Sequence, residues 1–411
     1  MLRVWTANQH AGMLDRFRER GSTFAYTPGT RPELAVSITM PVRTASWDTG
    51  FGLAPIFEMN LPEGALRERL TKRFAKALGR FDDFDLLSVT GRTQIGRLRY
   101  SGHKENLSEE VPFQSVDELL RARRESDLFD HVMATFETHS GISGVQPKVM
   151  IRDDTKDAAV GNNAVKLEKP TIHGATHIVK FWNPADYPEL AANEYFCLRV
   201  AQKLNFQVPD FQLSDDGAVL IVERFDRRPD GSYLGFEDFC VLNGQQTAQK
   251  YDGGYEKKLF RRINDFISPR HLNADLEIAF RLFVLNCAIR NGDAHLKNFG
   301  VIYEDPAPDS VRLAPVYDIV TTAAYIPNDR MALTLNGRPD WPNAKELINL
   351  GRTRADLSSA EIKEIMSTTA DAMRSIAPEA EKYFENSKYP EIGRQMLSAW
   401  QRGIADMSRT D

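Results

Sequence analysis

The segment "DLEIAFRLFVLNCAIRNGDAHLKNFG", residues 275–300, joins an almost unbroken apolar run to a short stretch crowded with polar side chains. Large apolar residues cover most of the circumference of the predicted helix, so we expect this helix to be buried on several sides. Gly292 is typical of a helix end and predicts that the helix stops there. A rigid helix that ends in a loop can hold polar side chains in fixed positions, as catalysis requires.

Within that loop, Asp293 and Asn298 form the pattern D-x-x-x-x-N. A carboxylate at the first position can accept a proton from an attacking hydroxyl, and an amide five residues later can reach a Mg²⁺ ion without adding charge. Lys297 can neutralise charge that develops on a transferred phosphate. The spacing is that of the catalytic loop of protein kinases. Taken alone, it also fits a capped, hydrogen-bonded loop with no catalytic role.

Four other stretches fit a nucleotide-dependent kinase, and they occur in the matching order. "SGISGVQPK", residues 140–148, has glycines that let main-chain N–H groups approach phosphate oxygens. Lys180 is the lone charge in the strand-like "HIVKF" and can bind phosphates, with Glu194 in the following helix as its ion-pair partner. "VERF", residues 222–225, can form a hinge that binds adenine. Asp318 in "YDIV" can supply a second Mg²⁺ ligand.

The bulk properties are those of a chain with more than one globular domain. At roughly 150 residues per domain, 411 residues with 42% hydrophobic and 10% aromatic content predict two or three domains. The net charge of −5 does not indicate wholesale binding to nucleic acid or to membrane surfaces. Three widely spaced cysteines in apolar surroundings predict buried thiols in a reducing cytosol. No apolar run of about 18 residues occurs, so we expect a soluble, cytoplasmic protein.

The pattern of apolar residues changes along the chain and divides it into four segments. Residues 1–102 are β-rich, with the strand-like runs "LRVW", "LAVSITM" and "QIGRLRY", and they include one amphipathic helix, "EGALRERLTKRFAKAL". Residues 103–136 are predicted to be a helical connector with Ser115 as an N-cap. Residues 137–235 read as a β-rich lobe with one inserted helix. Residues 236–411 are mostly helical.

Taken together, these motifs resemble the HipA family of bacterial serine/threonine kinases, which act as toxins of type II toxin–antitoxin pairs. The resemblance rests on "SGVQPK", "HIVKFW", "YPELAANEYF", "VERFDRR", "EDFCVLNGQ", "NGDAHLKNFG" and "YDIV". The first hundred residues match as well, through "SITMPVR", "PIFEMNLPEGALRERL" and "DDFDLLSVTGRTQIGRLRY". The resemblance implies an α+β, bilobal, protein-kinase-like fold with an N-terminal β-rich subdomain, a kinase N-lobe-like region and an all-helical C-terminal lobe.

The resemblance also implies ATP and Mg²⁺ as cofactors and a role for individual residues. Asp293 would be the catalytic base, and Asn298 and Asp318 would be the magnesium ligands. The ATP-binding residues would come from the Gly-rich loop, the strand lysine, the hinge, the catalytic loop and the later aspartate: Ser143, Gly144, Val145, Gln146, Pro147, Lys148, Lys180, Glu223, Arg224, Phe225, His295, Leu296, Lys297, Asn298 and Asp318.

Known members of this family phosphorylate aminoacyl-tRNA synthetases, which stalls translation and arrests growth. A protein substrate of this kind is therefore expected, together with a HipB-like helix-turn-helix antitoxin and with operator DNA only indirectly, through that antitoxin. Several members autophosphorylate a serine of the Gly-rich loop. Gly141 stands where the family often has one such serine, so we predict modification of Ser143, with Ser140 as its neighbour. A phosphate there would add about −1.5 to −2 charge where ATP phosphates bind.

Three other functions are compatible with parts of the sequence. Small-molecule kinases of the aminoglycoside-phosphotransferase kind share the Asp-x-x-x-x-Asn loop, but the β-rich N-terminal region matches the toxin family instead. A non-catalytic co-repressor scaffold would not need Asp293, Asn298 and Asp318, all of which are present. A metal-dependent nuclease would need more metal ligands than the single His295 beside Asp293.

Overall fold

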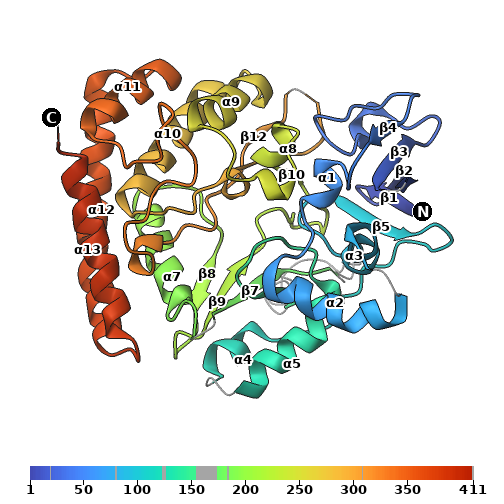
Figure 1. The fold of residues 1–411 in the computed structure, drawn as a ribbon, viewed down its shortest axis with the longest axis horizontal. Coiled ribbons are helices and arrows are strands. Elements are labelled where there is room, and N and C mark those ends of the chain that lie inside the picture. Colours follow the sequence, from blue (N-terminus) through green and yellow to red (C-terminus); the bar gives the residue numbers. More distant parts are fainter. Residues whose placement is uncertain are drawn as a thin grey trace, which may run out of the picture. The chain divides into compact units, whose positions relative to one another are not determined.

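A computed structural model describes residues 1–18, 20–78, 81–122, 126–153, 174–182, 185–307 and 309–409, and Figure 1 traces its helices and strands. The chain forms two compact units. The first consists of Met1–Phe181, Asp210–Glu237 and Ile302–Ser310, and the second of Trp182–Pro209, Asp238–Val301 and Val311–Asp411. Within the described ranges, no helix is both long and apolar enough to cross a membrane.

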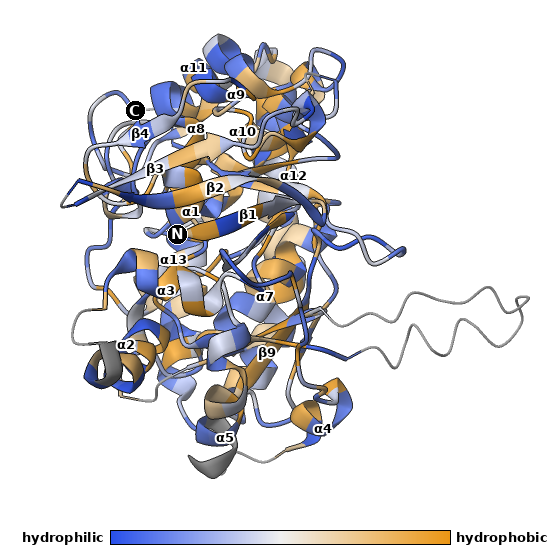
Figure 2. Cartoon of the chain, turned by 90° about the vertical axis from the view of Figure 1, so that its right-hand side faces the viewer, coloured by the Kyte–Doolittle hydropathy of each residue, from blue (hydrophilic) through white to orange (hydrophobic). Residues whose placement is uncertain are grey.

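A five-stranded antiparallel sheet of order β4-β3-β2-β1-β5 forms the N-terminal part of the first unit. Its strands are β1 (Leu2–Thr6), β2 (Gln9–Phe17), β3 (Gly21–Tyr26), β4 (Trp47–Thr49) and β5 (Leu98–Gly102). Along β1, Leu2, Val4 and Thr6 are buried while the residues between them are half-exposed, so one face of the strand packs into the core. The strands accordingly carry both polar and apolar residues in Figure 2.

The first unit also contains helices. They are α1 (Pro55–Glu58), α2 (Gly64–Leu78), α3 (Asp83–Thr90), α4 (Val116–Arg121) and α5 (Ser126–Phe136). The amphipathic helix predicted from the spacing of Leu66 and Leu70 is α2, and both side chains are buried. The predicted N-cap is also confirmed, because the side chain of Ser115 accepts a hydrogen bond from the N–H of Glu118 at the start of α4.

A second antiparallel sheet of order β6-β7-β9-β8 completes the first unit. It consists of β6 (Lys148–Ile151), β7 (His177–Phe181), β8 (Phe211–Leu213) and β9 (Val219–Glu223), and it includes the predicted strands "KVMI" and "HIVKF". In its register, Lys148 lies opposite Lys180, and His177 lies opposite Glu223. The predicted Gly-rich loop, strand lysine and hinge are therefore joined to one sheet.

The second unit is mainly helical. Its helices are α7 (Leu190–Lys203), α8 (Phe239–Leu242), α9 (Arg261–Phe266), α10 (Leu272–Ala288), α11 (Ala344–Arg354), α12 (Ser359–Glu385) and α13 (Pro390–Asp406). The last two helices, α12 and α13, lie side by side (Figure 1). Helix α7 packs on α12 through the rings of Phe196 and Phe384. Helix α7 thus belongs to the second unit, although it was expected within the β-rich lobe.

The mixed α+β fold is confirmed, and the three cysteines are buried as predicted. The C-terminal region is not entirely helical, because residues 236–411 also contain β11 (Gly300–Tyr303) and β12 (Arg312–Leu313), which join β10 (Gly235–Asp238) in a short sheet. The apolar run "GVIY" of β11 is too short to show a period that separates strand from helix. The expected boundaries at residues 102, 136 and 235 stay predictions.

Two local predictions were wrong. Residues 34–40, "LAVSITM", form no strand, because a buried carboxylate accepts their polar groups in place of a neighbouring strand: Glu237 binds the hydroxyl of Ser37 and the N–H of Ile38. Helix α10 ends at Ala288, four residues before Gly292. Arg290, and not the glycine, takes the left-handed conformation, with φ of +59°.

Candidate active site

The loop after α10 holds its polar side chains through a compact set of hydrogen bonds. The N–H of Asp293 donates to Oδ1 of Asn291 at 3.1 Å, and the N–H of His295 donates to Oδ1 of Asn298 at 3.1 Å. Gly292 approaches Asp329 so closely that a Cβ would lie 2.3 Å from a carboxylate oxygen. This close approach, and not a helix stop, explains the glycine at this position.

Asp293 is a half-buried carboxylate in the loop, five residues after the end of the buried helix α10. The hydroxyl of Tyr251 donates to its Oδ1 at 2.7 Å. Burial raises the pKa of Asp293 above its usual range, while the hydrogen bond from Tyr251 and the charge of Lys250 act in the opposite direction. The carboxylates of Asp318 and Asp329 raise that pKa further. Such a carboxylate is suited to accept a proton from a hydroxyl.

Asn298 and Asp318 lie next to each other. Nδ2 of Asn298 donates to the main-chain oxygen of Asp318 at 3.3 Å, which directs the amide oxygen away from this contact. Asp318 has φ of +53°, a left-handed conformation that aspartate tolerates better than most residues and that is common at functional sites. Mg²⁺ prefers oxygen ligands and binds proteins through one or two carboxylates together with water and phosphate. These two oxygen-bearing side chains fit that requirement.

Lys297 forms an ion pair with a residue that is distant in the sequence, Asp238. Its Nζ lies 2.8 Å from Oδ2 of Asp238, and the two side chains are only 7% and 3% exposed. Oδ1 of Asp238 also accepts the N–H of Val241 and so caps α8. The lysine is therefore held in place by a short helix as well as by its own loop, and Asp238 balances part of its charge.

His295 is neutral at physiological pH. Burial lowers its pKa to about 3, and the positive charges of Lys250 and Lys297 act in the same direction. Its ring packs edge-on against the ring of Tyr251, with 5.0 Å between the ring centroids. His295 therefore shapes the surroundings of Asp293 without supplying positive charge.

In the first unit, the predicted Gly-rich loop is anchored at both ends. Oε1 of Glu63 accepts the hydroxyl of Ser143 at 2.6 Å and the N–H of Gly144 at 3.1 Å. Toward β6, Nε2 of Gln146 donates to the main-chain oxygen of Phe181 at 3.1 Å. Gly144 has φ of +118°, which only glycine adopts readily.

Lys148 and Lys180 stand directly opposite each other on β6 and β7. Directly opposed residues of an antiparallel pair project from the same face of the sheet, so two ammonium groups share one face. Both lysines are buried, at 4% and 5% exposure. A Cβ on Gly144 would lie 2.4 Å from Nζ of Lys148, so this ammonium reaches the Gly-rich loop. A loop with glycine at its bend beside two cations fits a polyphosphate.

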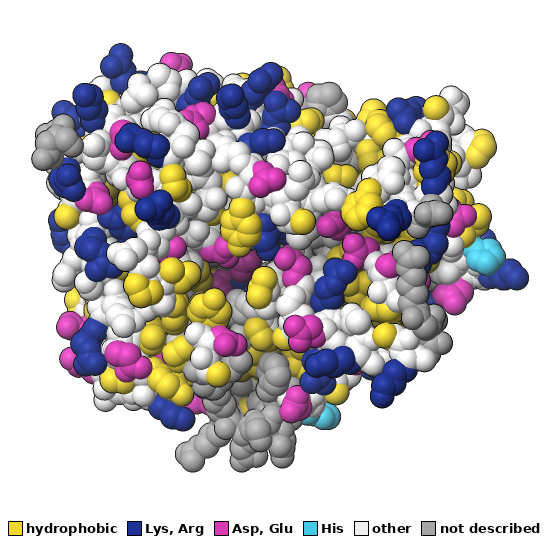
Figure 3. Space-filling view, in the orientation of Figure 1, with side chains coloured by type: hydrophobic (Ala, Val, Ile, Leu, Met, Phe, Trp, Pro, Cys, Tyr) yellow, Lys and Arg dark blue, Asp and Glu magenta, His cyan; other side chains and the backbone are white. Residues whose placement is uncertain are grey.

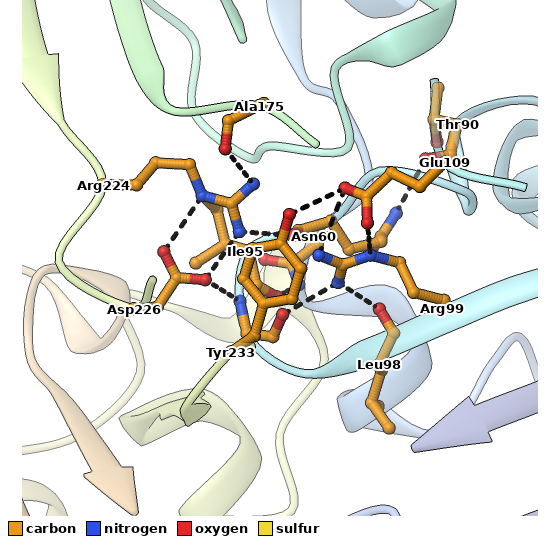
Figure 4. A network of polar contacts seen from close by, with 12 residues as sticks. Asn60, Thr90, Ile95, Leu98, Arg99, Glu109, Ala175, Arg224, Asp226 and Tyr233 are labelled. Atoms are coloured by element: carbon orange, nitrogen blue, oxygen red, sulfur yellow. Dashed lines mark hydrogen bonds and ion pairs between the residues drawn. The ribbon is translucent and has the colours of Figure 1, made fainter. Parts of the chain in front are cut away.

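The predicted hinge, Glu223 to Phe225, begins at the last residue of β9, and its N–H groups are partly used by main-chain hydrogen bonds. The N–H of Glu223 donates to Asp210, and that of Arg224 donates to Thr176. The side chain of Arg224 does not reach a surface, because it enters the buried network of Figure 4.

In that network Arg224 forms a two-point ion pair with Asp226, with N–O distances of 3.0 and 2.6 Å. Figure 4 also shows Tyr233 beside this pair and beside a second one, Arg99 with Glu109. The carboxylate of Asp226 additionally accepts the N–H of Gly96 at 2.6 Å. The side chain of Arg224 is thus committed to structure.

The predicted site residues form one group in each unit. The first unit holds Ser143, Gly144, Val145, Gln146, Pro147, Lys148, Lys180, Glu223, Arg224 and Phe225, and the second holds Asp293, His295, Leu296, Lys297, Asn298 and Asp318. Sequence reasoning missed Glu63, Asp238 and Tyr251. Each belongs to a recognisable local signal. Glu63 lies in the turn "NLPEG", Asp238 is the N-cap of a short helix, and Tyr251 lies in "KYD" before a pair of glycines. None of those signals names its distant partner.

Comparisons with known proteins show the family of the chain. The family model described as the HipA-like C-terminal domain matches residues 140–377, and the one described as the HipA N-terminal domain matches residues 2–101. Two Sinorhizobium fredii proteins named "Putative kinase Y4dM" and "Putative kinase Y4mE" are 27% and 26% identical over 372 and 346 residues. These alignments cover 86% and 79% of this chain and 83% and 78% of the relatives.

A solved structure has the same fold over nearly the whole chain. It is the HipA toxin in the Shewanella oneidensis MR-1 complex of HipA, HipB and its operator DNA, with a TM-score of 0.67 at 19% identity. The similarity covers 99% of this chain and 98% of that chain. On the face drawn in Figure 3, basic and acidic side chains are interspersed, in keeping with the small net charge.

Proposed function

This chain belongs to the HipA family, and from that premise we propose that it is an ATP-dependent serine/threonine protein kinase that acts as the toxin of a type II toxin–antitoxin pair. The observation that carries the proposal is the loop 293–298. In this loop the half-buried carboxylate of Asp293 accepts a hydrogen bond from a hydroxyl group. The same loop carries the amide of Asn298, which contacts the second predicted metal ligand, Asp318. The relatives that carry the name kinase support the same activity.

Asp293 is the proposed base. It accepts the proton of the substrate hydroxyl as that oxygen bonds to the γ-phosphorus of ATP, while the bond from this phosphorus to the bridging oxygen of ADP breaks and ADP leaves with the electron pair. Asn298 and Asp318 would hold Mg²⁺, which supplies charge neutralisation on the phosphates when bound. Lys148 and Lys180 would bind phosphate oxygens, and His295 to Lys297 would border them. The main chain at Glu223 to Phe225 would bind adenine.

The substrate class follows from the family. We propose a protein substrate, either an aminoacyl-tRNA synthetase or another translation component, whose phosphorylation arrests growth. A HipB-like helix-turn-helix antitoxin would be the partner, and operator DNA would be reached only through it. The Shewanella relative was solved with HipB and operator DNA, which supports this choice of partner.

Autophosphorylation is proposed at Ser143. The hydroxyl of Ser140 is fully buried, donates to the oxygen of Phe136 at 2.7 Å and accepts the N–H of Met150 at 2.8 Å, so it serves the core. Ser143 is half-buried and has its hydroxyl on the side chain of Glu63. Mass spectrometry after incubation with Mg-ATP should find phosphate on Ser143 and none on Ser140.

The decisive experiment compares the wild-type chain with Asp293→Asn. Both would be expressed in a host and tested in its lysate with labelled ATP, followed by phosphoproteomics. We expect labelled host protein and growth arrest with the wild type, and neither with the variant, which should still bind ATP. Asp340→Asn makes the same change at an exposed aspartate and should behave as wild type. Transfer that persists in Asp293→Asn, or labelling of small molecules alone, would refute the proposal.

A further inference from the structure

Tyr251 reaches the proposed catalytic base from the solvent side. Its side chain is 47% exposed, and its hydroxyl donates to Oδ1 of Asp293 at 2.7 Å. A general base must lie within about 2.6–3.2 Å of the oxygen whose proton it takes. The phenolic oxygen therefore stands where the oxygen of an incoming hydroxyl would have to stand to use this carboxylate oxygen.

The segment that carries Tyr251 is fixed on both sides. Before it, the oxygen of Lys250 accepts the N–H of Leu296 at 3.1 Å, which joins the segment to the loop of Asp293. After it, the hydroxyl of Tyr255 donates to the oxygen of Ala294 at 2.9 Å. The hydrogen bond from Tyr251 is therefore part of a held geometry and not an accident of a loose loop.

The ring of Tyr251 is held as well. It packs against the imidazole of His295 at 71°, and Nζ of Lys250 lies 5.6 Å from the ring centroid. Nearly half of the side chain is nevertheless exposed to solvent. A ring with this much exposed surface can turn aside when another molecule arrives.

We propose that the hydroxyl of Tyr251 occupies the place of the phosphoryl-acceptor hydroxyl on Asp293 and keeps water from it until a protein hydroxyl displaces the phenol. This inference rests on the proposed kinase function and adds the device that selects protein hydroxyls over water. Water and a protein hydroxyl compete for the same oxygen of the carboxylate. A tethered phenol is displaced by a docked protein more readily than by water, because docking supplies binding free energy elsewhere on the surface.

The test is the Tyr251→Phe variant, which keeps the ring and removes only the hydroxyl. The first readout is inorganic phosphate released from Mg-ATP with no protein acceptor added. The second is the Michaelis constant for dephosphorylated casein, a serine-rich probe. We expect phosphate release to rise and the Michaelis constant to fall, each about 2- to 10-fold, the factor that corresponds to one net hydrogen bond. The maximal rate of transfer to casein should change less than the Michaelis constant.

Tyr187→Phe is the matched control, because Tyr187 is 45% exposed, lies in the same unit and also packs edge-on against another ring, that of Tyr325. It should leave both readouts as in wild type. Equal melting temperatures of the three proteins exclude a folding effect.

Unchanged phosphate release in Tyr251→Phe would overturn the inference while leaving the kinase function intact. A fall in the maximal rate together with a fall in phosphate release would also overturn it, because Tyr251 would then orient Asp293 and not block it. Phosphate found on Tyr251 itself would make this residue an acceptor and would likewise refute the blocking role. A wild-type chain that transfers no phosphate to any protein would remove the proposed function, and this inference with it.

Discussion

The hydroxyl of Ser143 donates a hydrogen bond of 2.6 Å to Oε1 of Glu63, and the same oxygen accepts the N–H of Gly144 at 3.1 Å. Glu63 comes from the turn before α2, and this turn touches the loop directly, since a Cβ on Gly64 would lie 2.5 Å from the oxygen of Val145. One carboxylate thus holds both the proposed modification site and the main chain of the Gly-rich loop.

A phosphate on Ser143 would remove the donor and set about −1.5 to −2 charge against the carboxylate of Glu63. We therefore expect Ser143→Asp, which adds a negative charge at this position, to weaken ATP binding by about tenfold or more. The reason is that the new carboxylate repels the carboxylate of Glu63 and the phosphates of ATP, and two like charges about 4 Å apart repel by roughly 4 kcal/mol near a protein surface. Adding Glu63→Gln should restore part of the affinity, since glutamine can still accept the N–H of Gly144 and carries no charge. Titration with a fluorescent ATP analogue measures both effects.

Ser88→Asp is the control for this prediction, because it adds the same charge at an exposed serine of the same unit. It should leave ATP affinity unchanged. Equal affinities of Ser143→Asp with and without Glu63→Gln would show that Glu63 does not sense the charge at Ser143.

The buried pair of Arg224 and Asp226 should be a strong determinant of stability. Both side chains are almost completely buried, and Asp226 also accepts the N–H of Gly96 near the start of β5. Asp226→Ala would leave the guanidinium buried without its main counter-charge. We expect a loss of about 3–5 kcal/mol in the free energy of unfolding, measured by denaturant titration.

An exposed ion pair provides the comparison. Asp371 and Arg374 lie on the surface of α12, with side chains 69% and 61% exposed. Asp371→Ala should cost less than about 1 kcal/mol. If the two variants lost equal stability, the buried network would have no special role.

Much of the fold was predictable because its signals are local. The helix of residues 64–78, the N-cap at Ser115 and the strand around Lys180 all follow from spacing or capping within a few residues. Residues 34–40 have the composition of a strand but do not form one. Their polar groups bind a single side chain about two hundred positions away, that of Glu237. No local pattern contains that partner.

The candidate site divides in the same way. The contiguous loop from Asp293 to Asn298 could be found in the sequence because its chemistry lies within six residues. Glu63, Asp238 and Tyr251 could not, because they meet their partners across 80, 59 and 42 positions. Such contacts depend on how sheets and helices return along the chain, which spacing alone does not determine.

Glu237 should make stability depend on pH. Its carboxylate is buried and accepts hydrogen bonds from Ser37, Ile38 and Tyr303 at 2.6–2.8 Å. Burial raises the pKa of Glu237 from 4.5 to about 7. The folded chain therefore holds a proton that the unfolded chain releases between these values, so this contribution to stability is complete below pH 4.5 and is lost as pH rises through about 7.

Glu237→Gln removes this titration. We expect the melting temperature of the wild type, relative to that of the variant, to fall by a few degrees between pH 5 and pH 8. Glu364→Gln changes an exposed glutamate of α12 and should show no such trend relative to wild type. A constant difference between wild type and Glu237→Gln across this range would contradict the assigned protonation.

Asp318→Asn tests the proposed metal ligand without disturbing its backbone. Asparagine tolerates the φ of +53° at this position, whereas alanine would be strained. The variant keeps an oxygen but loses the negative charge that attracts the cation, so the Mg²⁺ concentration for half-maximal phosphoryl transfer should rise by about tenfold or more.

High Mg²⁺ should therefore restore much of the transfer rate in Asp318→Asn. The same addition should not rescue Asp293→Asn, because a lost base is not replaced by metal. Chelation should stop transfer in every variant, and Asp340→Asn, at an exposed position, should follow the wild-type Mg²⁺ titration. If Asp318→Asn needed the same Mg²⁺ concentration as the wild type, the carboxylate of Asp318 would not bind the metal. The ligand would then have to be sought among the other acidic residues near Asp293.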